Sequence, residues 1–239
     1  MMLSLPPTPL FATNVHAGYQ APQLANTLVV YRISVADFTE REAALTALLT
    51  PAEQQHAARY TRLADQLRFR VGRACLRYLL GQRLGQPPAT IALRVGSYGK
   101  PQLAEPASVH FNVAHSGDWV VVALAAREVG IDLEQLVADF DFSDVAAQRF
   151  SDPERRLLSL SHEPHITFYH IWTQLEARAK ASGVGLGDAE LRPAASGYPA
   201  AQWTVQNFGL IPGHPGALAY PADWQPVIQF RSLDARLIG

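Results

Sequence analysis

The sequence repeats one order of local signals, and this repeat limits the possible folds more than any other feature. "LTPAEQQHAARY" at residues 49–60 and "FSDPERRLLSL" at residues 150–160 each place a hydroxyl residue and a proline where a helix begins. A longer helical pattern follows each segment, over residues 65–85 and 166–183. Because strand patterns lie between them, we predict an α+β chain of two similar halves that meet near residues 125–128.

Alternating and β-branched runs predict the strands of both halves. They lie at residues 28–34, in a strand, turn and return over 91–103, in a meander over 108–136, and at 202–208, 216–220 and 227–233. The N-terminal stretch is rich in proline and lacks the features of a signal peptide, so we expect an irregular arm there. The predicted division is an arm at 1–27, an N-terminal half at 28–125 and a C-terminal half at 126–239.

The overall charge gives no reason to expect a nucleic acid or a membrane as partner. The 239 residues include 20 Lys and Arg against 21 Asp and Glu, a formal net charge of −1. No apolar run reaches the ~20 residues that span a bilayer. Glycine-rich phosphate loops such as GxxxxGK[ST] and GxGxxG do not occur, so a local basic cluster must hold any phosphate ligand. Cys75 is the one cysteine, which excludes an intrachain disulfide and suits a cytoplasmic protein.

Two carboxylates in "VGIDLEQL", residues 129–136, are the first candidates for chemistry. Asp132 and Glu134 are two apart in a predicted strand, so their side chains share a face and repel each other unless a cation lies between them. Glu176 and Lys180 are four apart on the second long helix and share one helix face. If strand and helix meet, the three carboxylates offer the oxygen ligands that Mg²⁺ prefers. Solvated acids on a strand edge and a surface ion pair remain the alternative from these residues alone.

Basic and polar residues of the N-terminal half are the second group of candidates. "HFNVAHSGDW" places His115 where a strand turns, either as a hydrogen-bonded turn residue or as a ligand. Lys100 lies between glycine and proline in "YGKP", where a lysine is either solvated or a good phosphate contact. Five arginines gather at the first long helix and its entry, and they cannot all face one ligand: Arg59, Arg62, Arg68, Arg70 and Arg73.

Taken in order, "YGKP", "FNVAHSGDWVV", "VGIDLE" and "FYHIWTQLEARAKASGVGL" resemble the motifs of the 4′-phosphopantetheinyl transferases of the surfactin-synthetase-activating type. The last of them is similar to the family pattern W[ST]xKExxxKxxGxGL. The resemblance implies an α+β fold of two similar α/β halves related by pseudo-twofold symmetry, with coenzyme A in the cleft between them. It implies Mg²⁺-dependent transfer of the phosphopantetheine arm of coenzyme A to a serine of an apo acyl or peptidyl carrier protein, with release of 3′,5′-ADP. Because one chain supplies both halves, a monomer is the simplest expectation.

The resemblance also implies a role for each residue of the acidic group. Asp132, Glu134 and Glu176 would hold the metal on the pyrophosphate of coenzyme A. Lys180 would stabilise or protonate the leaving phosphate. Serine is a poor nucleophile that needs a base, for which Glu176, or a metal-bound water near it, is the candidate.

The basic group would bind the nucleotide. Lys100 and His115 would contact the nucleotide end of coenzyme A, with His115 at its 3′-phosphate, and Asn112 would line the site near His115. Arg68 is a further phosphate contact. The lysines that some family members use for the 3′-phosphate are missing here, and the residues that would replace them are His56, Arg59 or Arg62.

Two positions depart from the family pattern. Leu175 stands where the family usually has Lys, so we expect Leu175→Lys to keep or raise turnover. Ala114 stands where the family often has Ser, which removes one hydrogen bond worth about 0.5–1.5 kcal/mol. Two alternatives therefore stay open: a Mg²⁺-dependent phosphoanhydride hydrolase, and a weak or silent module that binds coenzyme A or a carrier protein.

Overall fold

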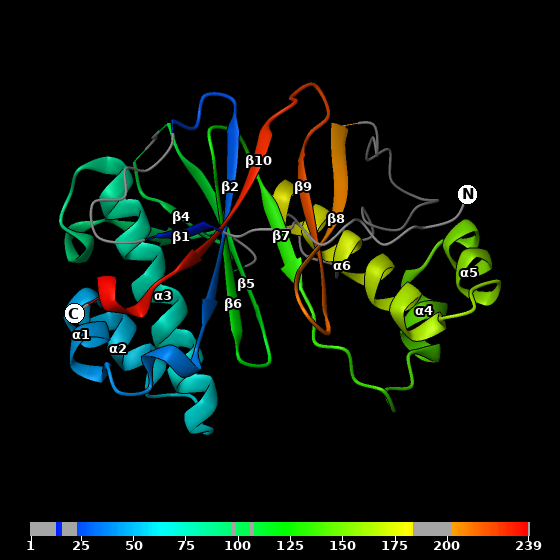
Figure 1. The fold of residues 1–239 in the computed structure, drawn as a ribbon, viewed down its shortest axis with the longest axis horizontal. Coiled ribbons are helices and arrows are strands. Elements are labelled where there is room, and N and C mark those ends of the chain that lie inside the picture. Colours follow the sequence, from blue (N-terminus) through cyan, green and yellow to red (C-terminus); the bar gives the residue numbers. More distant parts are fainter. Residues whose placement is uncertain (1–12, 16–22, 97–98, 106–107, 184–201, 239) are drawn as a thin grey trace.

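The computed structural model shows a mixed α+β architecture, drawn in Figure 1. It describes residues 13–15, 23–96, 99–105, 108–183 and 202–238. Most of the predicted arm at 1–27, Tyr98 of "YGKP" and the last residues of "ASGVGL" lie outside this range.

The helices follow the order that the sequence predicts. They are α1 (Glu42–Leu48), α2 (Pro51–Ala57), α3 (Leu63–Leu84), α4 (Ser143–Arg149), α5 (Asp152–Ser159) and α6 (Pro164–Ser182), with single 3-10 turns at Ala36–Phe38, Pro88–Thr90 and Ala235–Leu237. Within the described segments, no helix is long and apolar enough to cross a membrane.

The strands form three sheets. The five-stranded sheet has the order β1 (Thr13–Val15), β10 (Val227–Leu233), β2 (Thr27–Ser34), β6 (Trp119–Ala125) and β5 (His110–Ser116). The three-stranded sheet has the order β7 (Gly130–Leu133), β9 (His214–Pro221) and β8 (Trp203–Ile211). A small hairpin joins β3 (Leu93–Val95) to β4 (Pro101–Leu103).

The local helix signals are confirmed. Thr50 and Ser151 both form capping boxes, in which the hydroxyl accepts a hydrogen bond from the backbone N–H three residues on. The long helices α3 and α6 end at Gly85 and Gly183, both in the left-handed conformation that glycine adopts without strain. These four residues fix the helix ends from sequence alone.

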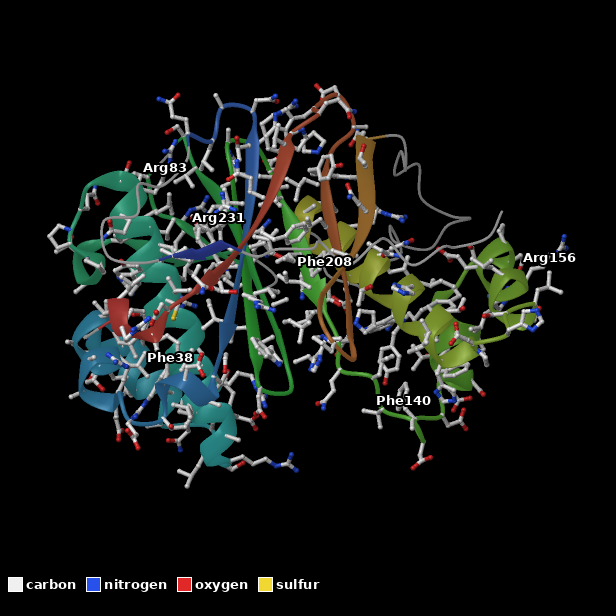
Figure 2. All side chains as sticks on the ribbon, viewed as in Figure 1. Phe38, Arg83, Phe140, Arg156, Phe208 and Arg231 are labelled. Atoms are coloured by element: carbon white, nitrogen blue, oxygen red, sulfur yellow. The ribbon has the colours of Figure 1, made fainter. Side chains whose placement is uncertain are left out.

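The elements stack in four layers, with helix α3, the five-stranded sheet, the three-stranded sheet and helix α6 in succession (Figure 1). Strand β6 is apolar throughout because both of its faces are covered. Val120 and Val122 belong to the core shared with α3, whereas Val121 and Ala123 belong to the core between the two sheets. The side chain of Phe208 on β8 fills this second core from the other side (Figure 2).

The last strand of the chain lies in the sheet of the N-terminal half. Strand β10 runs parallel to β2, with Val227 opposite Thr27, and separates β2 from β1. The strand β1 lies within the range predicted as an irregular arm. The range predicted as the C-terminal half, 126–239, thus contributes one strand to the sheet of the range 28–125.

A buried ion pair links helices α2 and α3, and its removal is expected to be costly. The Arg77 side chain is 2% exposed; its Nε lies 2.7 Å from Glu53 Oε2, and its Nη1 donates to the carbonyls of Pro88 and Ile91. We expect Arg77→Leu to lower the free energy of unfolding by about 3 kcal/mol, because it leaves two carbonyls without this donor and removes the nearest positive charge from Glu53. Arg73→Leu is the matched control, since Arg73 reaches the same carboxylate at only 3.3 Å. Urea unfolding followed by circular dichroism measures both, and equal losses would contradict the central role of Arg77.

Candidate functional site

Strand β7 and helix α6 bring an acid and a lysine into direct contact. Lys180 Nζ donates a hydrogen bond to Asp132 Oδ1 at 2.6 Å, and Asp132 is only 4% exposed. The other carboxylate oxygen, Oδ2, is buried and has no hydrogen-bond partner among the described residues. The predicted meeting of strand and helix is therefore present, with one acceptor oxygen left open.

Small residues allow this close approach. The inner face of α6 and the strand beside β7 meet through alanines, Ala177, Ala181, Ala217 and Ala219. On β7 itself, a Cβ added to Gly130 would lie 1.9 Å from the carbonyl oxygen of Ala177. The helix backbone thus lies directly on the strand, which only glycine at this position permits.

Glu134 lies just beyond the end of β7 and is held by two side chains. Ser116 Oγ donates to Glu134 Oε2 at 3.0 Å, and Trp172 of α6 also hydrogen-bonds this carboxylate. Burial and the nearby charge of Asp132 raise the pKa of Glu134, and the two hydrogen bonds oppose the rise. Its orientation is therefore fixed by partners from both halves of the molecule.

Glu176 has a raised pKa. Burial is the main cause, with Asp132 and Glu134 adding to it and Lys180 and Arg149 opposing it, so that the pKa rises to about 7. The pKa of Asp132 is also raised, by burial against the opposing charge of Lys180. Three acids thus share one partly desolvated region that contains a single lysine.

The donor set fits a hard cation. No three His, Cys, Asp or Glu side chains in the described ranges are arranged to hold a metal as they stand. The buried, unpartnered Oδ2 of Asp132 and the mutual repulsion of the three carboxylates nevertheless favour an added positive charge. Oxygen-only donors are those of Mg²⁺ rather than zinc.

Arg68 and His115 lie together at the β5–β6 turn. Arg68 Nε donates to the carbonyl of Gly117 at 2.9 Å, and its Nη1 pairs with Asp65 at 2.9 Å. His115 is open to solvent on one side, yet desolvation by the surrounding protein, with the charges of Arg68 and Lys180, lowers its pKa. Arg62 lies apart from them, exposed at the N-cap of α3.

Lys100 and Asn112 point into the protein. Lys100 Nζ donates to the carbonyls of Lys180 at 2.6 Å and Val129 at 3.2 Å, and burial lowers its pKa to about 8. Asn112 is 3% exposed, and its Oδ1 accepts from the backbone N–H of Ile131 at 2.8 Å. Their predicted contacts with a nucleotide stay predictions.

A cavity of about 470 Å³ opens beside Lys100 at the C-terminal end of α6. Its polar lining includes both signs of charge, with Arg94, Lys100, Gln102, Glu105, His110 and Glu128. Ala181, Ser182 and Gly183 at the end of α6 also line the cavity, and no residue of the acidic group belongs to its lining.

The structure places both residues that depart from the family pattern in apolar surroundings, and it revises the expectation for Leu175. Leu175 is 5% exposed and packs in an apolar cluster with Phe150, Phe168 and Ile171. Ala114 is 4% exposed and belongs to the core between the sheets. The Leu175 side chain does not face the acidic group, because neighbouring residues on a helix point to different sides. Ala114 shares its strand face with Asn112 and Ser116. We therefore no longer expect Leu175→Lys to keep or raise turnover, and we expect it to lower the stability of the fold.

Leu175→Lys is expected to destabilise the protein by at least about 3 kcal/mol, because it places an ammonium group in an aromatic and aliphatic cluster. Gln174→Lys is the matched control, since Gln174 is only partly buried on the same helix. Thermal unfolding of the two variants measures the difference. A stable Leu175→Lys variant with raised turnover would restore the first expectation.

Sequence reasoning missed three residues of the site, Ser116, Trp172 and Gly130. Ser116 follows His115 and Trp172 lies one helical turn before Glu176, but no local pattern pairs either of them with Glu134. Glycine directly before the "IDLE" carboxylates was the available signal for Gly130, since glycine inside a strand marks a close backbone approach.

Two protein-family models match successive parts of the chain. The model described as 4′-phosphopantetheinyl transferase, N-terminal, matches residues 38–127, and the model described as 4′-phosphopantetheinyl transferase superfamily matches residues 128–210. The second match contains the acidic strand and the helix that faces it.

Several curated proteins are similar to the chain. The 4′-phosphopantetheinyl transferase HetI of Nostoc sp. is 32% identical over 173 residues, 70% of this chain and 73% of that protein. A 4′-phosphopantetheinyl transferase of Bacillus subtilis is 31% identical over 61% of this chain and 65% of its own length. A putative 4′-phosphopantetheinyl transferase of Synechocystis sp. is 37% identical over 59% of each chain. The match thus spans less than two thirds of the last two relatives.

Proposed function

Since the chain belongs to the 4′-phosphopantetheinyl transferase family, we propose that it transfers the 4′-phosphopantetheine group of coenzyme A to a serine hydroxyl of an apo acyl or peptidyl carrier protein. The second product is 3′,5′-ADP. The observation that supports this most is the group on β7 and α6, in which Lys180 contacts Asp132 while Glu134 and Glu176 lie within their electrostatic reach. Such a group suits phosphoryl transfer, which depends mainly on positioning and on neutralising charge.

In this proposal the serine oxygen attacks the phosphorus that carries the pantetheine arm. The bond from this phosphorus to the oxygen of the ADP portion breaks, and that oxygen leaves with 3′,5′-ADP. Glu176 is the candidate base that takes the serine proton. Lys180 stabilises or protonates the leaving phosphate. Arg68 and His115, which lie together at the β5–β6 turn, bind the nucleotide end.

Asp132, Glu134 and Glu176 would hold Mg²⁺. When bound, the ion supplies positive charge that stabilises the pyrophosphate oxygens as the bond breaks. The unpartnered Oδ2 of Asp132 supports this assignment, because a buried carboxylate oxygen without a donor suits a cation.

Exposed apolar side chains support a protein as acceptor. Val137 and Phe140 are 51% and 38% exposed on the loop that follows Glu134, where Figure 2 shows Phe140 near the surface. Tyr60 and Leu63 are 38% and 79% exposed at the entry to α3, beside the exposed Arg62. We propose that an acidic carrier protein docks across these two segments.

If charge pairing contributes to docking, raising the salt concentration to about 0.5 M is expected to increase the KM for the carrier several-fold while coenzyme A binding changes little, because exposed pairs are screened most. Steady-state kinetics with the carrier and calorimetry with coenzyme A give the two numbers. Equal weakening of both would remove the charge-pairing part of the proposal.

Two similar halves related by a pseudo-twofold axis are also part of this proposal. A short capped helix followed by a long helix occurs twice, as α2 with α3 and as α5 with α6, which supports it. A monomer fits these features, since one chain supplies β7, α6 and the β5–β6 turn that Arg68 contacts. A cytoplasmic location is also part of the proposal, and the buried, free Cys75 fits it.

Intact-protein mass spectrometry tests the proposed function. An apo carrier protein is incubated with the chain, coenzyme A and Mg²⁺, beside a control with a chelator. A gain of one phosphopantetheine, about 340 Da, that the chelator prevents is the expected result. Release of 3′,5′-ADP without label on the carrier would favour the hydrolase, and coenzyme A binding without turnover would favour the silent module.

A further inference from the structure

Among the residues that the structure describes, strand β7 has one paired edge and one edge without a strand partner. Its even-numbered side is occupied by the β8–β9 hairpin, since Glu134 N–H donates to the Pro215 carbonyl at 3.0 Å and Leu136 N–H to the Gly213 carbonyl at 2.9 Å. Because backbone groups of a strand alternate in direction, the odd-numbered residues present theirs to β5. Strand β5 lies beside this edge, but within the described part of the chain its one strand partner is β6.

Three side chains of the N-terminal half satisfy this free edge at odd-numbered positions. Lys100 Nζ donates to the carbonyl of Val129 at 3.2 Å, and Asn112 Oδ1 accepts from the N–H of Ile131 at 2.8 Å. The Ser116 hydroxyl accepts from the N–H of Gln135 at 2.9 Å. Val129 and Ile131 are fully buried, so their backbone groups need these partners.

Two of these side chains, Ser116 and Lys100, also contact residues of the acidic group. Ser116 donates to Glu134, and Lys100 donates to the carbonyl of Lys180, which lies in the last turn of α6 where carbonyls lack helical partners. These side chains thus connect three parts of the molecule: strand β7 with Asp132 and Glu134, helix α6 with Lys180, and the N-terminal half.

We infer that Lys100, Asn112 and Ser116 are positioning residues, which form a side-chain ladder that holds β7 and α6 in the register the acidic group needs. The ladder takes the place of a backbone ladder between the two sheets. This role is separate from any contact with coenzyme A, and its catalytic consequence rests on the proposed function.

Amide hydrogen exchange of the full chain, measured by NMR without added ligand, tests the ladder directly. Asn112→Leu removes the acceptor at Ile131, and Ser116→Ala removes the acceptor at Gln135. Each is expected to speed exchange of its own amide by roughly two- to tenfold, the worth of one hydrogen bond, while Ser116→Thr restores the protection of Gln135. Unchanged exchange at both amides would overturn the ladder.

A separation of kcat from coenzyme A binding tests the positioning role. At saturating coenzyme A and carrier, Ser116→Ala and Lys100→Met are expected to lower kcat by on the order of tenfold, while the Kd for coenzyme A from calorimetry stays within about threefold. Ser116→Thr and Lys100→Arg keep the donors and are expected to recover kcat. Ser159→Ala, on the remote helix α5, is the control for loss of a hydroxyl.

The opposite pattern overturns the inference. A tenfold weaker Kd with unchanged kcat, about 1.4 kcal/mol of lost binding, would make these residues ligand contacts instead. If Asn112→Leu does not fold, two pairs of variants still test the inference: Ser116→Ala with Ser116→Thr, and Lys100→Met with Lys100→Arg. If the unmodified chain labels no carrier, the proposed function fails, whereas the exchange rates still decide whether the ladder exists.

Discussion

Asp132→Asn is expected to slow phosphopantetheine transfer by about a hundredfold to a thousandfold while the protein stays folded. Asparagine keeps the size of the side chain and an oxygen that can accept from Lys180, whose Nζ lies 2.6 Å from Asp132 Oδ1. It removes the negative charge and the second carboxylate oxygen, Oδ2, which is buried without a partner. Rates of carrier labelling measured by intact mass give the loss.

A binding measurement separates the metal role of Asp132 from other effects. Mg²⁺ is expected to raise the unfolding temperature of the unmodified protein and to have a smaller effect on Asp132→Asn, because a ligand stabilises only the state that binds it. Asp152→Asn is the matched control, since Asp152 is exposed at the start of α5, away from the proposed docking loop. Labelling by Asp132→Asn at the rate of the control would remove Asp132 from the metal assignment.

Gly130→Ala is the second substitution with a large expected effect, at least about 3 kcal/mol of lost stability. The added Cβ would lie 1.9 Å from the Ala177 carbonyl oxygen and 2.5 Å from the Ala181 backbone nitrogen, so it meets the backbone of α6 and not a flexible side chain. The helix must move away from β7, which separates Lys180 from Asp132. Urea unfolding and carrier labelling are both expected to report the loss.

Gly72→Ala provides the contrast for this prediction. Gly72 lies in α3, where an added Cβ would be 3.4 Å from Val120 Cγ1, an ordinary contact. Alanine is the better helix former, so Gly72→Ala is expected to be neutral or to stabilise the protein by up to about 1 kcal/mol. If Gly130→Ala were as stable and as active in carrier labelling as Gly72→Ala, the close approach of α6 to β7 would be needed neither for stability nor for activity.

The sequence by itself determined the features that depend on local spacing. Thr50 and Ser151 start their helices, and Gly85 ends α3, because caps involve groups within one helical turn. Asp132 and Glu134 could be placed on one face for the same kind of reason, since strand geometry alternates over two residues. The ordered motifs were sufficient to indicate the family, to which the chain belongs.

Only the tertiary structure decided which distant groups meet. Leu175 adjoins Glu176 in sequence but packs in an apolar cluster, because a helix turns about 100° per residue and α6 is covered on more than one side. Strand β10 lies in the sheet of the N-terminal half, which no local pattern indicated. Lys100 and Asn112 reach the free edge of β7 because a buried backbone group takes whichever partner the packing of remote segments provides, and that packing is a property of the whole chain.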